Sequence, residues 1–405
     1  MERFELIAPC HFGLEAVMKR EILDLGYEVS QVEDGRVTFI GDAEAVCRAN
    51  IFLRTTERIL LKVGSFKAET FEELFQGTRA IPWEQYIPRD GKFWVAKASS
   101  IKSRLFSPSD IQSIMKKAMV ERMKGAYGIT WFPEDGASYP LRVFLYKDVV
   151  TVAMDTSGDS LHKRGYRTLT SKAPITETLA AALLMLTPWK PDRILVDPFC
   201  GSGTLLIEAA QKAMNIAPGL KRRFAAERYS FVPAAIWAEQ RQKALADSKL
   251  DVGFEAFGYD IDPAAVALAN ANAKLAGMEK RCHFEVADVA DFAARSEAIV
   301  LTNPPYGERM STIEGAAKLA RTLGQQMEAH PCAGVYAITA DMDFEHHYGK
   351  RANKRRKMYN GMIPCQLYMY YNAPKFENRP AKPMPKSGFD GKRTQPGHTG
   401  RFEKK

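Results

Sequence analysis

A late segment of the chain brings together an amide, two prolines and an aromatic ring. It comprises Asn303, Pro304, Pro305 and Tyr306 and follows an apolar stretch, residues 299–302, that predicts a buried strand. Because consecutive prolines cannot extend a strand and fix the backbone, we expect this turn to hold one geometry. The Asn303 side-chain oxygen and the Pro304 carbonyl could then each accept one N–H of an amine.

The chemistry that suits this arrangement is the transfer of a methyl group from a sulfonium to an exocyclic amine of a nucleobase. The lone pair of such an amine is delocalised into the ring, so the nitrogen is a poor nucleophile until two acceptors turn it toward tetrahedral geometry. Proximity and alignment would supply most of the rate enhancement, and Tyr306 could stack on an extruded base. We therefore interpret these four residues as catalytic; the alternative is a turn that proline merely stiffens.

A second segment, Asp197–Thr204 (DPFCGSGT), joins a short apolar strand to an apolar helix. Gly201 and Gly203 allow positive φ and a close approach of ligand to backbone, and the helix N-terminus offers unpaired N–H groups. The pattern is not GxGxxG and no phosphate-binding lysine follows, so neither a dinucleotide nor a nucleoside triphosphate is favoured. The candidate cofactor residues in this segment are Asp197, Phe199, Gly201, Gly203 and Thr204.

Three further acids follow predicted strands. Asp260 directly follows the strand at residues 254–259 and could accept hydrogen bonds from two ribose hydroxyls. Asp262 precedes Pro263 and predicts a helix N-cap, and we include it among the cofactor candidates. Asp288 follows the strand at residues 283–286 and could bind an adenine amine; an ordinary loop aspartate is the alternative.

The elements that must position these residues alternate between strand and helix from about 175 to 372. This alternation predicts an α/β domain with a mostly parallel sheet and helices on both faces. Ligands of such sheets bind at the carboxyl ends of the strands, where strand order reverses. We therefore expect the glycine-rich segment, the acids and the NPPY segment to share one edge.

The N-terminal part has an α+β pattern instead. Residues 1–45 predict strand, helix and strand, and residues 46–158 predict a second unit that ends in a hairpin across Lys147-Asp148. The polar residues 159–175 predict a linker, which leaves 176–372 for the α/β domain. Residues 373–405 hold nine Lys or Arg and three Asp or Glu, and predict a basic, disordered tail that polyanions would attract. A solubilising tail without a partner is the alternative.

Composition excludes several classes of protein. No apolar run approaches the roughly 18–20 residues that cross a membrane, and no apolar signal core opens the chain. The six cysteines form no CxxC pair, which indicates reduced thiols in a cytoplasmic protein without a metal site. The net charge of +9 is concentrated in the tail.

Two other basic groups are candidates for contacts with RNA. Lys354, Arg355 and Arg356 belong to the cluster at 350–357, which predicts a charged connection between strands at 334–339 and 365–371. A solvated loop is the alternative to phosphate binding. Arg164 and Arg167 lie in the linker, where they could contact RNA or brace the linker against the α/β domain.

The motifs together resemble a known family. DPFCGSGT, Gly258–Pro263 (GYDIDP) and the NPPY segment are similar to class I methyltransferases that act on exocyclic amines. The linker Leu161–Arg167 (LHKRGYR) and the insertion Asn215–Leu220 (NIAPGL) resemble a narrower group, the THUMP-domain 23S rRNA guanine-N2 methyltransferases of the RlmL N-terminal/YpsC type. The resemblance covers residues 1 to about 372.

This resemblance implies a Rossmann-like class I methyltransferase domain preceded by an α+β ferredoxin-like and THUMP module that binds RNA. It implies S-adenosyl-L-methionine as cofactor, with Asp197, Gly201 and Gly203 at its methionine side, Asp260 at ribose and Asp288 at adenine. The expected product is N2-methylguanosine in 23S rRNA. Guanine-N2 methylation of tRNA, adenine-N6 methylation, and a non-catalytic RNA-binding factor in ribosome assembly remain alternatives.

Overall fold

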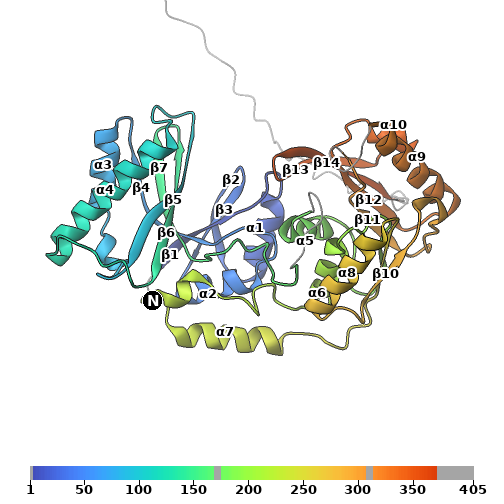
Figure 1. Cartoon of the computed structure of the whole chain (residues 1–405), viewed down its shortest axis with the longest axis horizontal. Coiled ribbons are helices and arrows are strands. Elements are labelled where there is room, and N and C mark those ends of the chain that lie inside the picture. Colours follow the sequence, from blue (N-terminus) through green and yellow to red (C-terminus); the bar gives the residue numbers. More distant parts are fainter. Residues whose placement is uncertain (1–2, 168–174, 307–312, 372–405) are drawn as a thin grey trace, which may run out of the picture. The chain divides into compact units, whose positions relative to one another are not determined.

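Two seven-stranded sheets organise the chain (Figure 1). The computed structural model describes residues 3–167, 175–306 and 313–371, so the predicted tail at 373–405 lies outside the described residues. Within these ranges no helix is long and apolar enough to span a bilayer.

The first sheet has the strand order β2-β3-β1-β4-β7-β6-β5. Leu6 and Ile7 of β1 pair with Leu61 and Leu60 of β4, so the two predicted units at 1–45 and 46–158 share one sheet. The boundary between them remains a proposal. The strands are β1 (Phe4–Pro9), β2 (Glu28–Glu33), β3 (Arg36–Gly41), β4 (Leu60–Lys67), β5 (Lys92–Ile101), β6 (Ser138–Tyr146) and β7 (Val149–Asp155).

The predicted hairpin across Lys147-Asp148 is confirmed. Strands β6 and β7 pair antiparallel up to Tyr146 and Val149, and the two turn residues have φ of 51° and 63°. Positive φ at both positions of a two-residue turn gives the backbone twist that matches paired strands.

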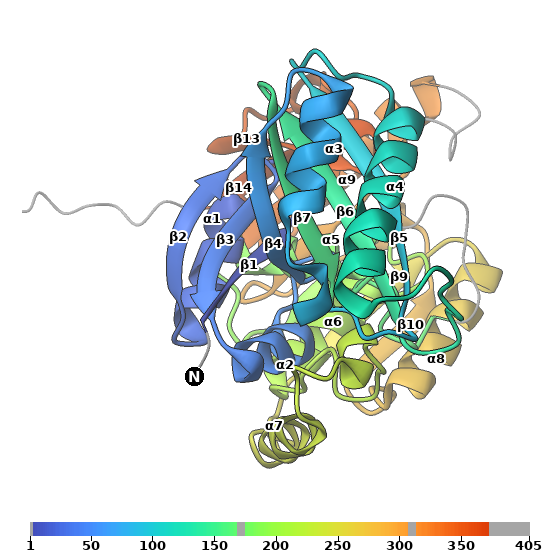
Figure 2. The same ribbon diagram turned by 90° about the vertical axis from the view of Figure 1, so that its left-hand side faces the viewer.

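Four helices pack against this sheet, and Figure 2 shows α3 and α4 lying across it. The helices are α1 (Glu15–Asp24), α2 (Ala43–Phe52), α3 (Phe71–Ala80) and α4 (Pro108–Tyr127), with a short 3-10 turn at Trp83–Gln85. Thr70 and Glu73 form a reciprocal capping box at the start of α3, where side chains satisfy the otherwise unpaired first N–H groups.

The second sheet has the order β10-β9-β8-β11-β12-β14-β13. Its first five strands are parallel, and β14 and β13 form an antiparallel hairpin at the other edge. The order runs outward in both directions from β8, which makes the end of β8 a topological switch point. The strands are β8 (Leu195–Asp197), β9 (Ala256–Asp260), β10 (Cys282–Val286), β11 (Ile299–Thr302), β12 (Gly334–Thr339), β13 (Lys354–Asn360) and β14 (Ile363–Tyr371).

Helices cover both faces of the second sheet, as predicted. Ile299 and Leu301 of β11 belong to a core that includes buried residues of α5, α6 and α8. Val300 faces the opposite way, into a core with Leu323 of α9, because successive side chains of a strand point to opposite faces. The helices are α5 (Glu177–Met185), α6 (Thr204–Ala213), α7 (Ala234–Ala246), α8 (Pro263–Ala276), α9 (Ile313–Ala329) and α10 (Phe344–Tyr348), with 3-10 turns at Ala225–Arg228 and Val289–Asp291.

Only the first half of the basic cluster at 350–357 is a connection, and it joins α10 to a strand that the sequence prediction lacked. Lys354–Asn360 is β13, paired along its whole length with β14 at the edge of the sheet. Charged side chains are frequent on edge strands because they discourage pairing with other chains. The charged sequence at 354–357 therefore suggested a loop, although its backbone is an extended strand.

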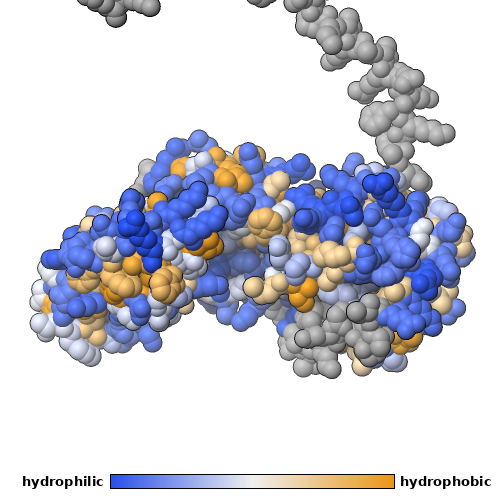
Figure 3. Space-filling view, turned by 90° about the horizontal axis from the view of Figure 1, so that it is seen from above, coloured by the Kyte–Doolittle hydropathy of each residue, from blue (hydrophilic) through white to orange (hydrophobic). Residues whose placement is uncertain are grey.

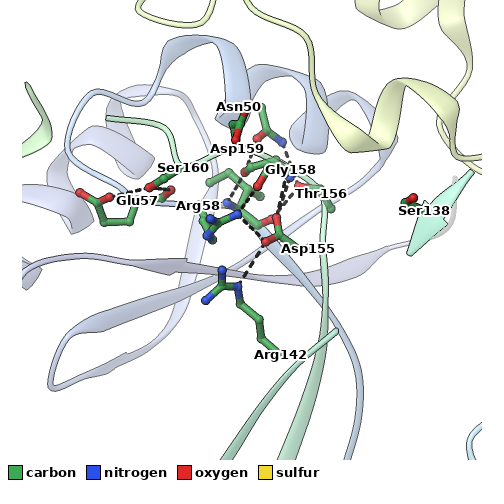
Figure 4. A network of polar contacts seen from close by, with 12 residues as sticks. Asn50, Glu57, Arg58, Ser138, Arg142, Asp155, Thr156, Gly158, Asp159 and Ser160 are labelled. Carbon is green, nitrogen blue, oxygen red and sulfur yellow. Dashed lines mark hydrogen bonds and ion pairs between the residues drawn. The ribbon is translucent and has the colours of Figure 1, made fainter. Parts of the chain in front are cut away.

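A polar network joins the end of β7 to the chain that follows it (Figure 4). The carboxylate of Asp155, which is 2% exposed, accepts from Arg58 at 2.7 Å and from Arg142 at 3.2 Å. The hydroxyl of Tyr229 donates to the Asp155 carbonyl at 2.7 Å. Removing either cation would leave buried charge uncompensated and would destabilise the fold, so the network holds the end of β7 against Arg58 and against β6.

Candidate active site

The glycine-rich segment follows β8 at the switch point and has the backbone that its sequence predicts. Gly201 and Gly203 have φ of 51° and 78°, and α6 begins at Thr204 with Gly203 as its N-cap. A Cβ at Gly203 would lie 2.7 Å from the Phe284 ring, whereas a Cβ at Gly201 would meet nothing within 4 Å. Gly203 therefore serves packing, and Gly201 leaves open space beside the backbone.

Asp260 binds the glycine-rich segment directly. Its Oδ2 accepts from the Gly201 N–H at 2.9 Å, and its Oδ1 accepts from the Asp262 N–H at 3.0 Å. Each carboxylate oxygen has a second acceptor site. The end of β9 therefore places an anionic acceptor next to the open space at Gly201.

Asp197 is buried beneath this segment, at 1% exposure. Its Oδ1 accepts from the Phe199 N–H at 3.0 Å and from the Thr302 hydroxyl at 2.6 Å. The carboxylate thus ties the start of the glycine-rich segment to the last residue of β11. The sequence predicts a cofactor role for Asp197 but gives no signal for Thr302, whose contact with Asp197 joins segments 105 residues apart.

Asp262 and Asp288 are exposed and cap the elements that follow them. Asp262 accepts from the Ala264 N–H at 2.9 Å, which confirms the predicted N-cap of α8. Asp288 accepts from the Ala290 N–H at 2.9 Å at the start of a 3-10 turn. Contacts of either side chain with a cofactor remain predictions.

The NPPY segment follows β11, which lies between β8 and β12. Asn303 is 6% exposed and Tyr306 8% exposed, Pro304 is buried and Pro305 half-buried. Since β11 is parallel to β8, the segment lies at the same edge as the glycine-rich segment. The expectation that both segments share one edge is confirmed.

The hydroxyl of Tyr306 is held by the β13–β14 hairpin. The Asn360 side-chain amide donates to it at 3.1 Å, and the Cys365 sulfur lies 3.6 Å away. Burial raises the pKa of the Cys365 thiol, an effect that the contact with Tyr306 opposes. The sequence offered no signal for either partner, and stacking of Tyr306 on a base remains a prediction.

The two linker arginines, Arg164 and Arg167, make buried contacts within the protein. The Arg164 side chain is 2% exposed, donates to the carbonyls of Leu161 and Arg54, and lies 3.5 Å from Glu208 of α6. The Arg167 side chain is 9% exposed and pairs with Glu177 of α5 at 3.1 Å. Buried guanidinium groups are not available to a polyanion, so the structure supports the bracing role rather than the RNA contact predicted for Arg164 and Arg167.

The β13 candidates differ among themselves. Lys354 is exposed, and Arg355 pairs with Glu345 at 3.2 Å while its side chain stays 51% exposed. Arg356 donates through Nε to the Gly13 carbonyl at 3.1 Å and so contacts the N-terminal module. Of the three, Arg356 serves the protein's own packing.

These donors and acceptors fit a nucleoside cofactor of the S-adenosylmethionine type. The open space at Gly201 leaves room for ligand atoms beside the backbone, and Asp260 presents acceptor oxygens of the kind that ribose hydroxyls need. Within the described ranges, no group of three or more His, Cys, Asp or Glu side chains could hold a metal ion.

Three family models match consecutive parts of the chain. An RlmL ferredoxin-like domain matches residues 5–60, and a THUMP domain matches residues 68–155. An RMKL-like methyltransferase domain matches residues 164–369, which contain both signature segments.

Two curated proteins match most of the chain. "Putative RNA methyltransferase YpsC" of Bacillus subtilis is 44% identical over 375 residues, or 92% of this chain and 97% of YpsC. "Ribosomal RNA large subunit methyltransferase K/L" of Syntrophotalea carbinolica is 33% identical over 380 residues. That match covers 88% of this chain but only 52% of the longer relative.

The solved structures that are similar over nearly the whole chain include the following two. SMU.472, solved in complex with SAH, is 39% identical with a TM-score of 0.87, and the match covers 92% of this chain and 99% of SMU.472. A protein from Listeria monocytogenes, described as a predicted N6-adenine-specific DNA methylase, is 44% identical with a TM-score of 0.86. The match covers 92% of this chain and 97% of that one.

Proposed function

Because the chain belongs to the RlmL/YpsC family of S-adenosylmethionine-dependent methyltransferases with a THUMP domain, we propose that it methylates N2 of guanine in 23S ribosomal RNA. The observation that supports methyl transfer to an amine is the link between the two signature segments. Asn303 follows Thr302, and Thr302 is hydrogen-bonded to Asp197 at the start of the glycine-rich segment. An amine held at Asn303 therefore lies next to the segment that would bind the cofactor.

In this mechanism the protein positions and polarises the amine. S-adenosylmethionine, when bound, supplies an electrophilic methyl group. The Asn303 side-chain oxygen and the Pro304 carbonyl accept the two N–H groups of the guanine amine, which directs the nitrogen lone pair toward that methyl. The amine nitrogen would take the methyl group as the bond between that methyl and the sulfonium breaks, which would leave S-adenosylhomocysteine, and the proton that the amine loses would pass to water. No strong base is required, since alignment supplies most of the rate enhancement.

RNA as substrate is supported by the THUMP match and by the names of the two curated relatives. Ribosomal RNA is supported by the longer relative, of which this chain matches about half. The name of the Listeria protein favours the competing reaction, adenine-N6 methylation of DNA. An Asn-Pro-Pro-Tyr segment suits both amines, so the two reactions must be separated by experiment.

The test uses the full chain and undermethylated nucleic acids from a strain that lacks it. Purified protein is incubated with S-adenosylmethionine and, separately, with 23S rRNA, tRNA or double-stranded DNA, and the nucleosides are quantified by mass spectrometry. We expect N2-methylguanosine in the 23S rRNA reaction alone. N2-methylguanosine in tRNA alone, or N6-methyladenine in any reaction, would replace this proposal with the corresponding alternative. No methylation in any reaction would favour a non-catalytic factor in ribosome assembly.

A further inference from the structure

The tip of the β13–β14 hairpin adjoins the NPPY segment and is exposed. Asn360 and Ile363 pair across a two-residue turn in which Gly361 has φ of 62° and Met362 is 93% exposed. The Asn360 amide contacts the Tyr306 hydroxyl at 3.1 Å. Any polymer whose base entered the NPPY segment would therefore pass close to this tip.

One face of β13 carries two cations followed by an aromatic ring. Arg355, Lys357 and Tyr359 are two residues apart, so their side chains share a face of the strand. All three are exposed, with the Tyr359 residue at 38%. The intervening Arg356 and Met358 face the other way, toward Gly13 and into the core respectively.

A second ring reaches the same place from the N-terminal module. Phe12 lies edge-to-face with Tyr359, with ring centroids 5.9 Å apart, and is 47% exposed. A Cβ at Gly13 would lie 2.9 Å from the Lys357 carbonyl, so glycine permits the close approach of this turn to β13. Two partly exposed rings thus come from segments about 350 residues apart in the sequence.

The surroundings are polar rather than apolar. The hairpin lies on the upper side of the chain in Figure 1, which faces the viewer in Figure 3. Hydrophilic residues predominate on that face, and apolar patches reach the surface between them. Cations next to exposed rings are a combination that binds single-stranded nucleic acid, since rings stack on bases and cations follow the phosphates.

We propose that Phe12, Lys357 and Tyr359 form a stacking ledge for a nucleotide of single-stranded RNA that flanks the target base. This inference rests on the proposed function for its ligand class. The Tyr359 ring stacks on the flanking base with Phe12 as its edge-on support, while Lys357 holds the adjoining phosphate. The ledge would keep the RNA extended on one side of the NPPY segment, so that the target base alone turns into the site.

Stacking is tested by two substitutions at one position of the full chain. Tyr359→Phe keeps the ring, and Tyr359→Leu keeps an apolar side chain without a π face. The probe is a fluorescein-labelled single-stranded oligoadenylate, and anisotropy gives its Kd at a salt concentration that weakens purely electrostatic contacts. We expect Tyr359→Leu to bind roughly tenfold more weakly and Tyr359→Phe to bind like the wild type. Thermal melting of both variants checks that each is folded.

The phosphate contact has a separate signature. Lys357→Gln should lower the slope of log Kd against log salt concentration by the share of about one phosphate contact, because one fewer counterion is released on binding. Lys274→Gln, at an exposed lysine near the end of α8, is the matched control and should leave that slope unchanged. Tyr359→Leu should weaken binding without changing the slope.

The ledge and the proposed function can fail independently. Wild-type affinity of folded Tyr359→Leu, or equal losses in Tyr359→Phe and Tyr359→Leu, would overturn the ledge even if 23S rRNA is methylated. A selective loss in Tyr359→Leu would support the ledge even if the modified nucleoside proves to be another. Lys357 would be removed from the proposal if Lys357→Gln left the salt slope unaltered. It would also be removed if Lys274→Gln lowered the slope as much as Lys357→Gln does.

Discussion

The Thr302 hydroxyl donates a hydrogen bond of 2.6 Å to the buried carboxylate of Asp197. Asp197 also accepts from the Phe199 N–H, so one carboxylate fixes the glycine-rich segment relative to the end of β11. Asn303 is the next residue after Thr302. In the proposed function, the distance between a bound methyl donor and the amine would therefore depend on this contact between two buried side chains.

Removing that hydroxyl should loosen the site. Thr302→Val keeps the side-chain shape but withdraws the donor, and a buried acceptor that loses its partner costs about 1–3 kcal/mol. We expect a decrease of that size in the free energy of unfolding from urea titrations, together with a lower kcat. Thr302→Ser, which retains the hydroxyl, should recover most of the activity. Equal kcat in wild type and Thr302→Val would show that the contact does not position the acceptor.

The two glycines of the signature should respond differently to alanine. Gly203→Ala introduces a methyl group against the Phe284 ring at positive φ, so stability should fall by about 1–3 kcal/mol. Gly201→Ala meets open space and suffers mainly the cost of positive φ, but its methyl group occupies the proposed cofactor cradle. Isothermal titration with S-adenosylhomocysteine should show the larger loss of affinity in Gly201→Ala. The reverse order would place the cofactor elsewhere.

We expect the Asp260 carboxylate to accept hydrogen bonds from the ribose hydroxyls of the cofactor. Asp260→Asn preserves an oxygen that can accept from Gly201 but loses the anion, and hydrogen bonds to charged acceptors are about twice as strong as neutral ones. The affinity for S-adenosylhomocysteine should fall roughly tenfold in calorimetry. Asp251→Asn, in an exposed turn before β9, is the control. An affinity within experimental error of the wild type would remove Asp260 from the cofactor site.

Glu57 should make stability sensitive to acid. Burial raises the pKa of its carboxyl, but hydrogen bonds from His11, His162, Thr178 and Ser160 outweigh that effect and hold the pKa well below its usual range. A depressed pKa in the folded state stabilises the protein above the unfolded pKa of about 4.3, and this contribution is lost as the pH falls below it. The melting temperature of the wild type should therefore fall more steeply below about pH 4.3 than that of Glu57→Gln. Parallel melting curves against pH would contradict this assignment.

The sequence predicts those features of the site that depend only on a residue and its immediate neighbours. Positive φ at Gly201 and Gly203 follows from glycine itself, and the cap at Asp262 follows from the proline after it. The partners of Tyr306 and the Asp197–Thr302 contact could not be predicted, because they join residues 54 to 105 positions apart. Such contacts depend on strand order, which periodicity does not determine.

The charge of a segment was a poor predictor of the role of its basic residues. Arg164 and Arg167 belong to a polar, turn-rich segment, yet buried carboxylates on α6 and α5 receive their guanidinium groups. The second half of the cluster at 350–357, which includes Arg356, resembled a loop, yet it belongs to an edge strand. In both places the partner that decides the role of the charge lies elsewhere in the chain, where local composition gives no signal.

The central claim, that Asn303 directs methyl transfer to a guanine amine, is tested most directly in the cell. The measurement is the N2-methylguanosine content of 23S rRNA from a deletion strain that expresses either the wild type or Asn303→Ala at equal levels. We expect the wild type to restore the modified nucleoside and Asn303→Ala not to do so, while purified Asn303→Ala still binds S-adenosylhomocysteine like the wild type. Restoration of N2-methylguanosine by Asn303→Ala would show that Asn303 does not direct the transfer.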